Sequence, residues 1–223
     1  MLPRAALFLL ADGRLPAGGY AHSGGLEPVV RIEGLRDAAG LNDFFEGRAC
    51  TAGMVAASFA AAACKAAQRE NPPLLVELDR QMDARTPSAA TRAVSRALGR
   101  QLLRVLMNIR PVPLHGQLRR DLHQPLVYGI AAASFGLTPQ DAAGVVLYES
   151  VAGPAAAAVK VLSIDPFAVQ SVLVGLTPLL DRLTGEAVAY ADTAPDQLPA
   201  LSTPLLDIAA EQHRNWGVRL FAS

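Results

Sequence analysis

The chain has few aromatic residues, no excess of either charge and no stretch in which apolar and polar residues alternate. Aromatics make up 5% of its 223 residues, and because β-strands favour aromatic and β-branched side chains, an all-β domain is excluded. Lys plus Arg and Asp plus Glu both number 20, so the basic excess typical of nucleic-acid-binding proteins is missing. The hydrophobic share of 51% excludes a disordered chain.

Cysteine is scarce too, and no segment suits secretion or a membrane. Cys50 and Cys64 lie on one predicted helix, roughly 21 Å apart along its axis, whereas a disulfide needs Cα atoms within roughly 7 Å. They are interpreted as small buried hydrophobes in a reducing compartment. The apolar run at residues 5–11 is too short for a signal peptide, and the uncharged stretch at 122–140 is broken by proline and glycine. We therefore expect a cytoplasmic protein that binds no membrane.

What the sequence has in abundance is alanine and leucine, the best apolar helix formers. Apolar residues recur at helical spacing across residues 42–69 and 74–84, and after four prolines that each follow a helix-capping residue. These four predicted starts are Thr86-Pro87, Thr138-Pro139, Asp165-Pro166 and Thr203-Pro204. The predicted fold is all-α, a single compact domain of about nine or ten helices over residues 1–223. The proline-rich residues 191–203 predict a flexible loop.

Residues 12–27 form the most unusual segment, with five glycines between residues 13 and 25. A phosphate-binding loop is excluded, because Gly19 and Tyr20 stand where that motif needs Lys and Ser or Thr. A serine hydrolase that uses Ser23 and His22 is a second hypothesis, although the flanking residues are not those of a nucleophile elbow. The structural alternative is that His22 packs inside a glycine-rich turn.

A permanent metal site is weakly supported. The four histidines, His22, His115, His123 and His213, show neither the spacing of a helical ligand pair nor a Cys-x-x-Cys partner. The residues themselves therefore imply no cofactor.

Four arginines recur at every fourth position of one predicted helix: Arg92, Arg96, Arg100 and Arg104. This arginine stripe is either a solvated polar face or a contact surface for an acidic patch on a protein partner. Gly99 in the same helix costs roughly 1 kcal/mol relative to Ala, which predicts close approach of another backbone.

Three further features remain open on pattern alone. His123 begins a segment with Tyr128 and Gly129 that reads as the start of a helix docked in the core. Lys160 ends an alanine-rich run, where a lone lysine is usually a solvated helix end. Residues 214–223 are too apolar for a free tail, so they dock either on their own domain or on a partner.

Several motifs together resemble one family. Residues 12–27 are similar to the Asp-x-x-Leu-Pro-x-Gly-Gly-Phe/Tyr-x-His-Ser-x-Gly-Leu-Glu signature of UreF, the urease accessory protein. Ser95-Arg96-x-x-Gly99-Arg100 resembles its central Arg/Gly helix, and residues 123–129 resemble its His-x-Pro-Val-Val-Phe/Tyr-Gly motif. Residues 204–223 resemble its C-terminus, so the four motifs span nearly the whole chain.

The resemblance implies an all-α homodimer without catalytic activity of its own. It implies a scaffold that joins the UreD/UreH accessory protein to the UreG GTPase, for GTP-dependent nickel delivery into apo-urease. GTP would be bound by UreG and nickel would only be in transit, with transient contact at His22 or Glu27. An alternative is a regulator of UreG GTP hydrolysis that acts through the arginine stripe.

The resemblance also implies roles for particular residues. Gly18, Gly19, His22, Ser23 and Glu27 would shape a turn whose rim meets partners. Arg96 and Arg100 would contact a partner or a second copy, and Lys160 would belong to a partner or dimer interface. His123, Tyr128 and Gly129 would support that surface from the core. The further expected partner contacts, in a tail that orders on binding UreD/UreH, are Arg219, Leu220 and Phe221.

Overall fold

The computed structural model describes residues 4–110, 112, 116 and 118–222, and within them the chain is all-α, as predicted, without a strand. Its helices are α1 (Arg4–Leu10), α2 (Leu26–Ile32), α3 (Ala38–Arg48), α4 (Met54–Gln68), α5 (Pro72–Ala84), α6 (Ala89–Ile109), α7 (Gln124–Ser134), α8 (Pro139–Val161), α9 (Pro166–Val188) and α10 (Pro204–Arg214). A π-helical turn, Ala49–Gly53, joins α3 to α4 without a break. The described residues thus hold ten helical elements, or nine helices if that pair counts as one, which confirms the prediction.

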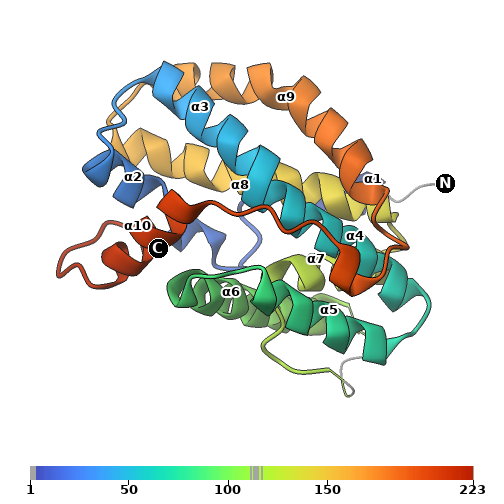
Figure 1. The fold of residues 1–223 in the computed structure, drawn as a ribbon. Helices are drawn as coiled ribbons and strands as arrows, with labels where there is room; N and C mark the ends of the chain where they lie inside the picture. The colour runs from blue at the N-terminus through green and yellow to red at the C-terminus, as the bar shows by residue number, and fades with distance from the viewer. Residues whose placement is uncertain (1–3, 111, 113–115, 117, 223) are drawn as a thin grey trace.

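The long α3–α4 helix runs through the middle of the molecule. In Figure 1 the pair α8 and α9 lies on one side of it and the pair α5 and α6 on the other. Helix α4 packs against α5, α7, α8 and α9 and is buried along most of its length. Small alanine side chains allow its neighbours to approach closely, so the alanine-rich composition becomes a tightly packed centre.

Glycines at two helix contacts explain how closely the backbones pack. A Cβ on Gly129 of α7 would lie 2.4 Å from the Ala60 carbonyl oxygen of α4. A Cβ on Gly99 of α6 would lie 2.0 Å from the carbonyl oxygen of Leu122. Both separations are far below van der Waals contact, so only glycine fits. The prediction of close backbone approach at Gly99 is confirmed.

The predicted helix starts agree with the structure at two of four positions in full. Thr138 forms a capping box with Asp141, and the Asp165 side chain accepts the Phe167 N–H. The start at Thr86 was wrong by two residues, because the Thr86 hydroxyl donates to the Met82 carbonyl at the end of α5. Ser88 caps α6 instead. At the fourth position α10 begins at Pro204, but the preceding threonine makes no side-chain cap.

Two apolar stretches are long enough to cross a membrane by length and composition alone. They are Ala38–Gln68 and Pro139–Val161, and 72% and 56% of their most apolar windows is buried inside the fold. Core helices of this kind pass the same test, so the stretches are weak support for a membrane location. Cys64 is fully buried, as predicted, and burial raises the pKa of its thiol to about 12, whereas Cys50 is half-buried.

The loop predicted at 191–203 is held by basic side chains at the ends of α4 and α5: Lys65 and Arg69 pair with Asp192, and Arg85 contacts the later part of the loop. The Arg85 guanidinium donates to the backbone carbonyls of Asp196, Leu198 and Pro199. Leu198 is buried, and the short 3-10 turn Pro195–Gln197 precedes it. These contacts give the loop a defined path, and its flexibility stays a prediction.

Candidate functional site

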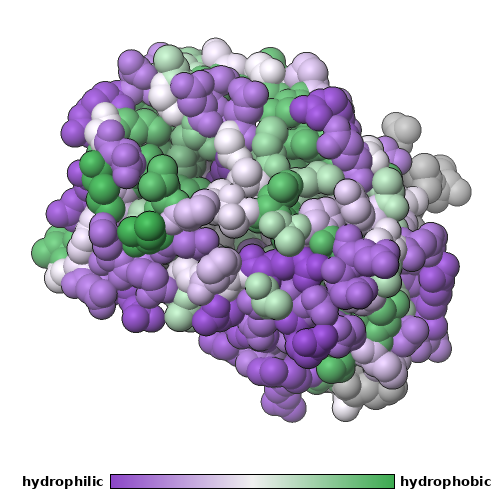
Figure 2. Space-filling view, viewed as in Figure 1, coloured by the Kyte–Doolittle hydropathy of each residue, from purple (hydrophilic) through white to green (hydrophobic). Residues whose placement is uncertain are grey.

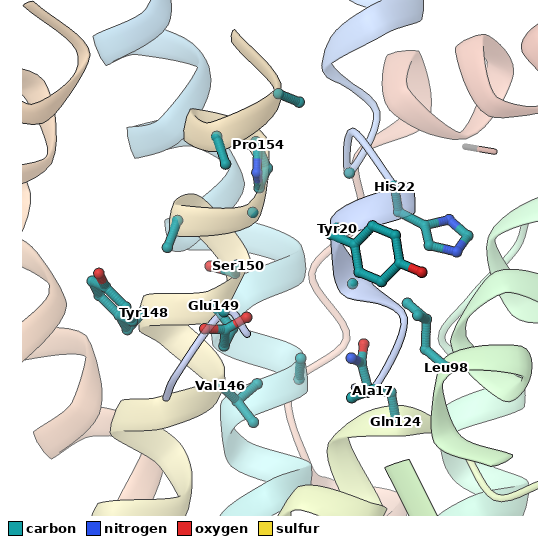
Figure 3. Close-up of a pocket in the computed structure, with 18 of the residues that line it drawn as sticks. Ala17, Tyr20, His22, Leu98, Gln124, Val146, Tyr148, Glu149, Ser150 and Pro154 are labelled. Atoms are coloured by element: carbon teal, nitrogen blue, oxygen red, sulfur yellow. The ribbon is translucent and has the colours of Figure 1, made fainter. Parts of the chain in front are cut away.

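A cavity of about 510 Å³ lies between the glycine-rich segment, the start of α7 and the exposed side of α8. In Figure 3, Glu149, Ser150 and Val146 of α8 face Tyr20 and Ala17 of the glycine-rich segment across this space. The structure brings several of the residues singled out from the sequence to its wall. These are Gly19, His22, Tyr128, Lys160 and Phe221.

Left-handed glycines shape the segment that covers the cavity. Gly24 has φ +60°, and a Cβ there would lie 2.8 Å from Cγ of Pro154 in α8. The segment therefore reaches the α8 surface only because this position has no side chain. Next to it, His22 lines the cavity, and burial lowers the pKa of its imidazole.

Ser23 is placed to hold the turn together rather than to attack a substrate. Its side chain is fully buried, and its Oγ accepts the backbone N–H of Glu27 at 3.2 Å. A nucleophile must be reachable by the substrate carbonyl. This burial argues against the serine hydrolase hypothesis.

Glu27 anchors the C-terminal segment. Its carboxylate is buried and accepts the backbone N–H groups of Leu220 and Phe221 at 2.9 and 3.0 Å. It also contacts Nε2 of His213 at 3.1 Å. The Ala222 N–H donates to the Ala21 carbonyl at 2.8 Å, which ties the end of the described chain to the glycine-rich segment.

The C-terminal segment thus docks on its own domain, one of the two alternatives that its apolar composition left open. That it orders on binding UreD/UreH stays a prediction. The physical reason for the docking is that Glu27 needs hydrogen-bond donors once it is buried, and the segment supplies them while Phe221 buries its ring. Arg31 adds a contact from the outside, since its guanidinium lies 4.1 Å from the centre of the Trp216 ring. A role of this segment in partner binding stays a prediction.

Replacing Glu27 with glutamine is expected to loosen this segment without unfolding the domain. Glutamine has one acceptor oxygen and turns an NH₂ group toward a backbone donor, so one charge-assisted bond is lost. Hydrogen exchange at Leu220 and Phe221 should quicken about tenfold to a hundredfold, as expected for a bond worth about 1.5–3 kcal/mol. The matched control is Glu46→Gln, on the exposed side of α3. Unchanged exchange in Glu27→Gln would contradict the anchoring role.

The arginine stripe divides into an internal half and an exposed half. Arg96 is 13% exposed and its guanidinium pairs with Asp79 at 3.1 Å and Asp83 at 2.6 Å. It also donates to the Asp121 carbonyl. Arg92 donates to backbone carbonyls that precede α6. The remaining two arginines of the stripe, Arg100 and Arg104, are exposed.

His123 lies in the same polar cluster beneath the surface. Its ring Nε2 contacts the Asp83 carboxylate at 2.8 Å, and its ring Nδ1 contacts the Ser95 hydroxyl at 2.9 Å. Its backbone N–H donates to the Asp79 carboxylate. Burial, the main cause, lowers the pKa of the imidazole. The cluster therefore fixes α5, α6 and the start of α7 together. Sequence reasoning missed its acids, although Asp79 and Asp83 are four residues apart on one helix face.

Glu149 is a cavity residue that no sequence pattern singles out. It is half-buried on α8 and has no ion-pair or hydrogen-bond partner among the described residues. Burial, helped by the negative charge of Asp12, raises the pKa of its carboxyl to about 7. Burial also raises the pKa of the neighbouring Tyr128 phenol. An unpartnered acid in a cavity is a common mark of a functional site.

A pH-dependent gain in stability is expected for Glu149→Gln. Because the folded chain holds the carboxyl proton up to about pH 7 and the unfolded chain releases it near pH 4.5, the wild type loses stability as pH rises through this window. The variant escapes this penalty, so it should match the wild type near pH 4 and exceed it by about 2 kcal/mol near pH 8. Urea denaturation at a series of pH values measures the difference. A constant difference across the series would show that the carboxyl is not desolvated.

The described residues contain no group of three or more His, Cys, Asp or Glu side chains that could hold a metal ion. His213 and Glu27 lie in contact, but the Glu27 oxygens are engaged by the C-terminal segment. His115, one of the histidines considered from the sequence, lies outside the described residues, as does Ser223 of the tail.

Comparisons with known proteins agree with the fold and the motifs. The UreF family model matches residues 35–177. The chain is 39% identical over 223 residues to the urease accessory protein UreF of Mycobacterium sp. (strain JLS), with all of both chains covered. It is 38% identical over 220 residues to that of Mycolicibacterium vanbaalenii, covering 98% of each chain. It is 35% identical to that of Mycobacterium tuberculosis H37Rv over the full length of both. The chain therefore belongs to the UreF family of urease accessory proteins.

Proposed function

We propose that this protein is a non-catalytic scaffold for urease maturation. It bridges a UreD/UreH accessory protein and the UreG GTPase in the cytoplasm and acts as a homodimer, so that nickel is delivered into apo-urease at the expense of GTP bound by UreG. The observation that carries the proposal is full-length similarity to relatives named urease accessory protein UreF. The burial of Ser23 supports a role without nucleophilic catalysis.

The surface around the C-terminal segment supports partner binding there. Leu205 and Ile208 of α10 and Val218 and Leu220 of the C-terminal segment are large apolar side chains that are 55–81% exposed. Figure 2 shows apolar side chains gathered on the side of the molecule where α2 and α10 lie in Figure 1. A cluster of exposed large hydrophobics is typical of a protein interface. We assign UreD/UreH to this surface, which we call the α10 surface.

The bridging role is tested by size-exclusion chromatography with light scattering, first on the chain alone and then with its cognate UreD/UreH, UreG, GTP and nickel. A co-eluting complex of two-fold symmetric mass is expected. If well-folded partners never co-elute with the chain, the scaffold proposal fails.

Deletion of residues 219–223 tests the assignment of the α10 surface. The truncated chain should bind UreD/UreH at least about tenfold more weakly, because it loses the exposed Leu220 side chain at the contact. Its far-ultraviolet circular dichroism should stay nearly unchanged, since no helix extends into the deleted residues. The Leu205→Ser variant removes apolar area from the same surface without touching Phe221 and serves as the matched comparison. Global unfolding of the truncated chain together with normal binding by Leu205→Ser would mean that the segment is ordinary core.

A second candidate role is regulation of UreG GTP hydrolysis through the exposed half of the arginine stripe. Arg100 and Arg104 are exposed on α6 and make no side-chain ion pair within the described chain. An inserted arginine can stabilise the charge that develops during GTP hydrolysis. UreG turnover measured with Arg100→Ala and Arg104→Ala tests the role, and turnover equal to that with wild type would dispose of it.

A further inference from the structure

Arg48 is a cationic side chain that has no carboxylate partner among the described residues. It stands at the end of α3, lines the cavity, and donates through Nε to the Ser150 carbonyl at 2.8 Å. No carboxylate in the described chain lies within ion-pair distance of its guanidinium. Arg96, by comparison, is matched by two aspartates.

The absence of a counter-ion at the Arg48 guanidinium has an energetic consequence. The Arg48 side chain is half-buried, and burial lowers the pKa of its guanidinium to about 10. Charged groups removed from water are normally paired, because the desolvation cost is several kcal/mol per ion. With Nε engaged by Ser150, the two Nη groups present an unused edge with the spacing of a carboxylate.

The other residues that line the cavity indicate which class of ligand it can bind. Many of its lining residues are alanine, glycine and other apolar residues, and its charged side chains besides Arg48 are Asp12, Glu149 and Lys160. The forked Nη pair of Arg48 matches the two oxygens of a carboxylate, which it can hold through two parallel hydrogen bonds. Gly24 adjoins the site, since a Cβ there would lie 3.4 Å from Nη2 of Arg48. A side chain at this position would crowd Nη2, and glycine avoids that contact.

We propose that this cavity binds a carboxylate group, held end-on by the two Nη groups of Arg48. The carboxylate belongs either to a small free acid or to an acidic side chain that a protein partner inserts. A volume of about 510 Å³ is within the range of small-ligand pockets, which is about 300–1,000 Å³. The apolar walls favour a carboxylate attached to a short hydrocarbon.

The first arm of the test uses free acids and does not depend on the proposed function. Sodium acetate, butyrate and benzoate are titrated into the ¹⁵N-labelled full chain, with sodium chloride at equal ionic strength as reference. Saturable shifts are expected at the amides of Gly24 and Ser150. The Arg48→Gln variant should raise the dissociation constant at least about tenfold, as expected for loss of a charge-assisted pair. Arg104→Gln, on the exposed face of α6, is the matched control and should behave as wild type.

The second arm rests on the proposed function and uses purified UreD/UreH and UreG. If a partner supplies the carboxylate, Arg48→Gln should weaken binding of that partner about tenfold. Arg182→Gln, on the exposed side of α9 and outside both candidate partner surfaces, is the control in this arm and should bind as wild type does. Arg48→Lys, which keeps the charge and loses the fork, replaces Arg48→Gln if the latter fails to fold. The proposal is overturned if no acid gives saturable shifts and the Arg48 variants bind partners as wild type does. If wild type binds neither partner, the scaffold proposal fails separately and the free-acid arm alone decides.

Discussion

Replacing Gly129 with alanine is expected to destabilise the protein by at least about 3 kcal/mol, because one methyl group overpacks the contact between α7 and α4. The new Cβ would lie 2.4 Å from the Ala60 carbonyl oxygen and 2.7 Å from the Cys64 backbone nitrogen. Neither atom can rotate away, since both belong to the backbone of the central helix. Relief requires that α7 move as a whole, which opens gaps against α6 and α8.

The matched control is Gly185→Ala in α9. A Cβ at Gly185 meets nothing within 4 Å, and the position is exposed. Because alanine is the better helix former, this variant should gain up to about 1 kcal/mol. Urea denaturation followed by circular dichroism gives both free energies of unfolding. Equal stabilities for the two variants would show that α4 and α7 do not approach as closely as described.

Replacing Arg96 with methionine should cost about 3–5 kcal/mol, because it leaves a buried carboxylate without its cation. Asp79 is buried and would keep only the His123 N–H as a partner. Asp83 would keep the His123 ring alone. Methionine preserves much of the side-chain volume, so the loss reports on charge and hydrogen bonding more than on packing.

Two comparisons make the Arg96 result interpretable. Arg104→Met removes an exposed arginine from the same helix and should change stability by no more than about 0.5 kcal/mol. Arg96→Met combined with Asp79→Asn should recover part of the loss, because the uncompensated charge is removed. Similar stabilities for Arg96→Met and Arg104→Met would mean that the four stripe residues contribute equally to stability. That result is expected if the stripe is a solvated polar face.

These two sites differ in how far the sequence predicts them. The central Arg/Gly helix was recognisable, and Gly99 predicted a close backbone approach that the structure confirms. The stripe itself did not reveal that Arg96 is internal and Arg100 exposed. At 100° per residue, positions four apart drift slowly around a helix, so neighbours in the stripe look alike from sequence. The packing of α5 and of the segment before α7 against α6 distinguishes them.

At the candidate site, too, some residues could be selected from the sequence and others could not. The glycine-rich segment was singled out by composition, and five of the selected residues line the cavity. Arg48 and Glu149 were not selected, because each lies in an ordinary helical pattern. An unmatched charge is visible only when every neighbour is known, and the cavity walls come from segments spread between residues 11 and 221.

The sequence by itself determined the all-α class and the residues at which some helices begin, as at Thr138 and Asp165. Those features depend on hydrogen bonds within two or three residues of the cap, which the order of residues specifies directly. Only the tertiary structure decided that Glu27 holds the C-terminal segment, through contacts 186 to 194 residues away along the chain. It also leaves Arg48 without a carboxylate partner in the described part of the chain. A buried charge takes whatever partner the packing of distant helices brings to it, and no local pattern encodes that choice.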